Sequence, residues 1–170
     1  TTLEIRDLKG KSATLSKVEK VRFLQDNIIS YQDQAWGDGK ILQEYQCSPG
    51  IPVDQYRSGH NTLVLISLRG IRNKGDVDEF RIDWKMKDVF LKSIGFWETS
   101  INHKTNKLCV NIIFPFSRPP RKCCLLESNN QSNTEVRNEV ITQLPDKRWQ
   151  LTWEKSNPLL HERYILNWIW

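Results

Sequence analysis

The sequence predicts an all-β fold, an antiparallel β-sandwich of the immunoglobulin-like type. Two observations predict it. Apolar and polar residues alternate in short runs, and from residue 62 onward turn-forming residues separate these runs at roughly ten-residue spacing. A period of two places one set of side chains in a core and the other set in water. We expect a single domain, 1–170, with a regular sandwich core at 62–170 and an N-terminal extension at 1–61.

The N-terminal extension opens with the features of a short strand and a tight turn. Leu3–Arg6 has strand character, and the following Asp7–Gly10 has turn character. A second turn is predicted at Trp36–Lys40, between the strand-like runs 28–31 and 41–45. These features predict hairpins in this part of the chain.

Residues 16–31 admit two interpretations. Ser16 and Glu19 have the spacing of a helix capping box, and apolar residues recur behind them at helical intervals. The same residues also fit two strands interrupted by a turn at Gln25–Asn27. The sequence leaves both a helix and a pair of strands open here.

The predicted core strands differ in how they distribute apolar residues. Strict alternation marks 80–86 and 149–154, where one face would be buried and the other solvated. The runs 62–68 and 107–114 are more continuously apolar, which favours central strands. The chain ends on RYILNWIW, 163–170, whose tryptophans indicate either a core strand or an exposed ligand platform. We expect the core strand, and truncation of the last four residues should therefore unfold the domain.

Composition excludes a disordered chain and a membrane span. Hydrophobic residues make up 38% and charged residues 26% of the chain, and no apolar run approaches the roughly 20 residues of a membrane-spanning helix. The cysteines, Cys47, Cys109, Cys123 and Cys124, lack the paired spacing of a zinc site, so no metal is predicted. Thiols without a disulfide framework are typical of a reducing compartment, and we expect a cytoplasmic protein.

Catalytic motifs are not found in the sequence. The three histidines, His60, His103 and His161, fall in predicted loops, and no nucleophile elbow, zinc-protease motif or phosphate-binding loop occurs. We therefore predict a non-enzymatic protein without a cofactor.

The basic balance of the chain points to an acidic partner. The net charge is +5, and the densest basic stretch is SRPPRK, with Arg118, Arg121 and Lys122 around a rigid proline turn. Guanidinium groups on such a turn can bind carboxylates or phosphates in a bidentate manner. The predicted contact residues are Arg118, Arg121, Lys122, Arg72, Lys74 and Trp97.

The partner is expected to be an acidic protein or a neighbouring domain of the same chain. The alternative is sequence-nonspecific nucleic-acid binding by the same basic surface. Reversing the charge of Arg118 and Arg121 should change stability by less than about 1 kcal/mol but weaken binding of the partner.

Four stretches together resemble an accessory β domain of larger, multidomain bacterial proteins. They are WGDG at 36–39, ISLRGIRNKGDVDEF at 66–80, FPFSRPPR at 114–121 and the tryptophan-rich terminal strand. The first residue is Thr1, and we expect a module cut from a longer protein. The resemblance identifies no named family and no activity, and it assigns no role to any single residue.

Overall fold

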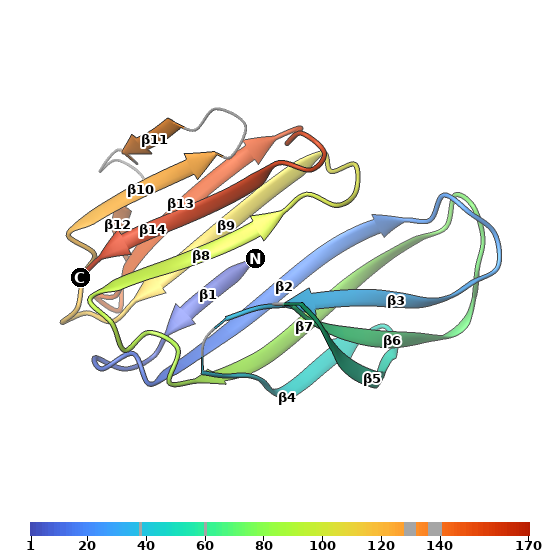
Figure 1. Cartoon of the computed structure of the whole chain (residues 1–170), viewed down its shortest axis with the longest axis horizontal. Helices are drawn as coiled ribbons and strands as arrows, with labels where there is room; N and C mark the ends of the chain where they lie inside the picture. The colour runs from blue at the N-terminus through green and yellow to red at the C-terminus, as the bar shows by residue number, and fades with distance from the viewer. Residues whose placement is uncertain (38, 60, 128–131, 136–140) are drawn as a thin grey trace. The chain divides into compact units, whose positions relative to one another are not determined.

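The computed structural model describes residues 1–37, 39–59, 61–127, 132–135 and 141–170. Throughout these ranges the regular elements are strands, which confirms the all-β prediction (Figure 1). No helix that could span a membrane occurs in the described ranges. His60, which was predicted to lie in a loop, falls outside them.

The helical interpretation of residues 16–31 is wrong. Strand β2, Ser12–Arg22, and strand β3, Ile28–Ala35, occupy this region, with a turn between them. The apolar spacing was misleading because Val18 faces solvent, whereas the neighbouring Lys17 points inward to an ion pair with Asp33. A strand that buries a lysine cannot show simple apolar alternation.

The chain forms two compact units. Unit 1 combines Thr1–Lys11 with Phe90–Trp170, and unit 2 is Ser12–Val89. The sequence placed the change in organisation near residue 61, inside unit 2. The stretch 47–58, which contains two prolines and a glycine, resembles a boundary loop, but strand β5 occupies Ile51–Ser58 within it.

Unit 1 contributes four strands to each of two sheets. Every neighbouring pair is antiparallel except β1 and β9, which run parallel. Figure 1 shows β10, β14 and β8 side by side, with the C-terminus at the end of β14. In spatial order, the strands of one sheet are β12 (Ile141–Gln143), β13 (Trp149–Ser156), β9 (Lys107–Phe114) and β1 (Thr2–Ile5), and those of the other are β11 (Ser132–Glu135), β10 (Lys122–Glu127), β14 (Arg163–Ile169) and β8 (Ile94–Ser100).

The C-terminal strand forms the centre of the unit 1 core. Trp168 is fully buried, and its ring lies 5.5 Å from those of both Phe90 and Phe114. Gly95 on β8 leaves room for this indole, because a Cβ there would lie 2.4 Å from the Trp168 ring. The prediction that RYILNWIW is a core strand rather than a ligand platform is confirmed.

Unit 2 contributes three strands to one sheet, β2, β7 (Val77–Lys87) and β4 (Lys40–Ser48), and its other sheet consists of β3, β6 (Asn61–Arg72) and β5 (Ile51–Ser58). The alternation at 80–86 is confirmed, with every second side chain buried from Phe80 to Met86. Tyr31 of β3 stacks on Phe80 at 4.3 Å, so aromatic contacts join the two sheets.

Candidate functional site

Three loops meet at one end of unit 1 and form a surface that we call the basic rim, defined as residues 7–11, 90–93 and 115–121. Backbone hydrogen bonds link its loops to one another and to strand β14. The Phe90 N–H donates to the Gly10 carbonyl at 3.0 Å, and the Arg121 N–H donates to the Ile169 carbonyl at 2.7 Å. The rim is therefore an ordered surface continuous with the end of β14.

Gly10 is required at the closest approach of two rim loops. Its φ is +68°, a left-handed conformation, and a Cβ would lie 2.0 Å from the Phe90 carbonyl oxygen. Any other residue would both strain the turn and push the loops apart. Asp7 supports the same turn, because its carboxylate accepts the N–H groups of Lys9 and Lys11.

Arg118 holds the rim together from its centre. Its guanidinium donates to the Leu8 carbonyl at 3.0 Å and to the Lys92 carbonyl at 3.2 Å, and it lies 3.8 Å from the centre of the Trp170 ring. Burial lowers the pKa of this guanidinium from its ordinary value, while the nearby Asp7 carboxylate acts in the opposite direction. These contacts give Arg118 a structural role in the rim, and its role as a partner contact stays a prediction.

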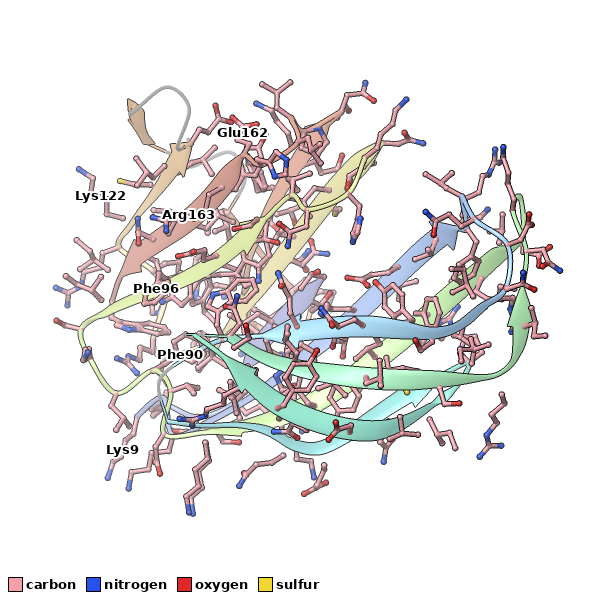
Figure 2. The ribbon with its side chains drawn as sticks, turned by 45° about the vertical axis from the view of Figure 1, so that its right-hand side comes forward. Lys9, Phe90, Phe96, Lys122, Glu162 and Arg163 are labelled. Atoms are coloured by element: carbon pink, nitrogen blue, oxygen red, sulfur yellow. The ribbon has the colours of Figure 1, made fainter. Side chains whose placement is uncertain are left out.

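The rim presents positive charge and apolar side chains together. Its cations are Lys9, Lys11, Lys92, Arg118 and Arg121, and the only carboxylate in its sequence is Asp7. Leu8, Leu91 and Phe116 from the three different loops are each more than half exposed. Figure 2 shows Lys9 at this end of unit 1, with Phe96 and Lys122 along the same side of the view. Exposed apolar groups ringed by one sign of charge are typical of interaction surfaces.

The other predicted contact residues of unit 1 differ in their exposure to solvent. Arg121 is exposed within the rim, and Lys122, directly after it, is also exposed. Trp97 is 8% exposed and packs inward, whereas its neighbour Phe96 is 46% exposed. The sequence indicated that one of this pair must face outward, and the register of β8 places Phe96 there.

Arg72 and Lys74 belong to unit 2. The Arg72 guanidinium donates to Asp78 at 2.8 Å, which commits much of its charge to an internal ion pair. Lys74 is exposed, and its backbone N–H donates to the side chain of Asp26. This loop therefore offers a weaker basic surface than the rim.

A polar network between the sheets of unit 2 was missed by sequence reasoning. Lys17 forms an ion pair with Asp33, which is only 3% exposed, and the Tyr45 hydroxyl donates to the same carboxylate at 2.9 Å. The Tyr31 hydroxyl donates to Glu19 at 2.6 Å. Burial raises the pKa values of both tyrosines above their ordinary range, and the nearby carboxylates add to this effect. The only signal in the sequence was Lys17, which follows Ala13 and Leu15 on the face of β2 that alternation places inward.

This network has the properties of a structural element. Lys17 is held between Asp33 and the ring of Trp84, 5.0 Å from the ring centre, so its charge is compensated on two sides. A buried ion pair with additional hydrogen bonds fixes the relative positions of the strands that carry it. We therefore assign this network to the stability of unit 2.

Other chemistry-bearing residues are dispersed. His103 and His161 are exposed in loops, and the four cysteines are unpaired. Across the residues that the structure describes, no cluster of three or more histidine, cysteine or acidic side chains is arranged to hold a metal ion. Comparisons of the chain with protein families, with curated proteins and with solved structures find no match.

Proposed function

We propose that this chain is a non-catalytic interaction module that binds an acidic protein partner through the basic rim. The observation that carries the proposal is the composition of the rim, in which several cations surround Leu8, Leu91 and Phe116 with one carboxylate among them. Protein interfaces combine apolar contact at their centre with charge complementarity at their edge. The acidic segment belongs either to a separate protein or to a neighbouring domain of a longer bacterial protein.

The ordered backbone of the rim supports this function. Arg118 and the links to Gly10 and Ile169 fix the three loops before any partner arrives. A surface that is already ordered loses little conformational entropy on binding.

Nucleic-acid binding is the second candidate, supported by the net charge of +5. Proteins that bind single strands stack bases on exposed aromatic rings. On the rim, Leu8 and Leu91 provide two of the three exposed apolar groups, and Trp170 is covered by Arg118. These features favour a protein partner.

The test is binding of fluorescein-labelled polyglutamate at low salt, followed by fluorescence anisotropy. Wild type should bind, and the rim variant Lys9→Glu/Arg121→Glu should bind about tenfold more weakly or worse. The matched control Lys104→Glu/Lys147→Glu carries the same change in net charge on other loops of unit 1. It should lose much less affinity for polyglutamate than the rim variant.

Two results would overturn the proposal. Equal losses in the rim and control variants would mean that only net charge matters. Tighter binding of a single-stranded oligonucleotide than of polyglutamate, at matched charge, would favour the nucleic-acid alternative.

The finer fold class and the cellular location belong to the same proposal. The two packed sheets of mainly antiparallel strands in unit 1 support an immunoglobulin-like sandwich. The unpaired state of the cysteines supports a cytoplasmic location.

A further inference from the structure

The sheet of β10, β14 and β8 carries apolar side chains on its outer face. We call this surface the outer face, and it consists of Lys122, Cys124, Leu126, Arg163, Ile165, Asn167, Ile169, Ile94, Phe96 and Glu98. Ile94, Ile169 and Phe96 are all exposed, and Ile94 lies directly opposite Ile169 in the register. An antiparallel sheet that faces only water normally alternates with polar residues at such positions.

The other sheet of unit 1 provides an internal comparison. On its outward side, Gln150 and Thr152 both hydrogen-bond to the side chain of Asn111, at 3.1 Å and 2.9 Å. Lys107 and Glu154 form an ion pair on the same side at 2.9 Å. Polar side chains therefore cover one sheet, and the apolar character of the outer face is not a general property of the unit.

A shallow hollow lies in the outer face. It has a volume of about 260 Å³ and is lined by Ile94, Lys122, Cys124, Asn167, Trp168 and Ile169. Phe96 adjoins it, since this residue lies opposite Asn167 in the register. The hollow thus has apolar walls, an exposed aromatic ring beside it and one ammonium group at its edge.

The outer face continues into the basic rim. Ile94 directly follows rim residue Ser93, whose carbonyl accepts the Trp170 N–H at 3.1 Å, and Ile169 accepts the Arg121 N–H. The apolar end of the face is the end nearest the rim, while Arg163 and Glu98 form an ion pair farther along the strands. Apolar contact and positive charge therefore lie on one continuous surface.

We propose that the outer face binds a partner segment in which an aromatic side chain stands among acidic residues. The aromatic side chain packs into the hollow against Phe96 and Ile94, and the neighbouring carboxylates lie near Lys122 and Arg121. Aromatic pairs gain from edge and offset stacking, and a lysine stem adds apolar contact while its ammonium group faces the ligand. This inference rests on the proposed function and specifies the chemistry of the partner.

The test compares two labelled probes, polyglutamate and a random copolymer of glutamate and tyrosine, with affinities expressed per carboxylate. Wild type should bind the copolymer about tenfold more tightly than polyglutamate. Phe96→Thr should remove this preference while leaving polyglutamate binding unchanged. Leu159→Thr, which removes an even more exposed apolar side chain from a loop of the same unit, should retain the preference.

The outcomes separate this inference from the proposed function. Equal affinity for the two polymers, or a preference that persists in Phe96→Thr, overturns the inference and leaves the function of the rim intact. Failure of wild type to bind either polymer overturns both. If thermal unfolding shows that Phe96→Thr is not folded, Ile94→Thr tests the same face and should reduce the preference.

Discussion

Replacing Arg118 by alanine should destabilise the protein, although this residue belongs to a basic loop. Its guanidinium makes two charge-assisted hydrogen bonds to backbone carbonyls and stacks on Trp170 at 3.8 Å. Hydrogen bonds to charged groups contribute about 1.5–3 kcal/mol each and a cation–π contact about 0.5–2 kcal/mol, and partial exposure reduces these values. We expect a loss of about 2–4 kcal/mol in the free energy of unfolding.

Urea denaturation followed by tryptophan fluorescence measures this loss. Arg121→Ala is the matched control, because Arg121 is an exposed arginine in the same loop, and it should change stability by less than about 0.5 kcal/mol. Arg118→Lys should fall between the two, since one ammonium group cannot reproduce the planar fork. If Arg118→Ala proves as stable as Arg121→Ala, the structural role assigned to Arg118 is wrong.

Three further predictions concern the interior. Gly95→Ala should destabilise unit 1 by at least about 1–3 kcal/mol in thermal or urea unfolding, because the new Cβ meets the Trp168 ring; unchanged stability would contradict this packing. Asp33→Asn should cost about 3–5 kcal/mol because it removes the nearer and more buried of the two carboxylates that pair with Lys17, and Lys17→Met/Asp33→Leu should recover much of that loss in a double-mutant cycle. Burial raises the pKa of the Cys123 thiol from 9.0 to about 12, so the folded state retains a proton that the unfolded state releases. Stability from this group is complete below about pH 9 and falls by about 1 kcal/mol per unit as the pH rises toward 12, a slope that Cys123→Ala should reduce in urea titrations at several pH values.

The sequence was most informative where burial follows a period of two. In 80–86 the alternation of Phe80, Ile82 and Trp84 with charged residues identified the buried face correctly, because neither face contains an exception. In β2 the same logic failed, since Lys17 is turned inward by Asp33, a residue on another strand. Alternation reports on burial, and it cannot reveal a buried ion pair formed by tertiary contacts.

The candidate site shows the same limit. The sequence indicated a basic loop at SRPPRK, but it could not show that Arg118 contacts Leu8, 110 residues away, and so distinguish it from Arg121. Nor could it choose between Phe96 and Trp97, because either of two adjacent aromatics can face the core until the strand register is known. The tertiary contacts of Arg118 and the register of β8 become known only from the folded structure.

Amide hydrogen exchange in the presence and absence of polyglutamate tests the central claim most directly. We predict slower exchange on binding in residues 7–11, 90–94 and 115–122, the segments of the rim and of the adjoining strand ends. The loop at 71–76, which carries Arg72 and Lys74, should be unchanged. Protection confined to 71–76, or no protection in the rim at a polymer concentration that saturates binding, would contradict the account.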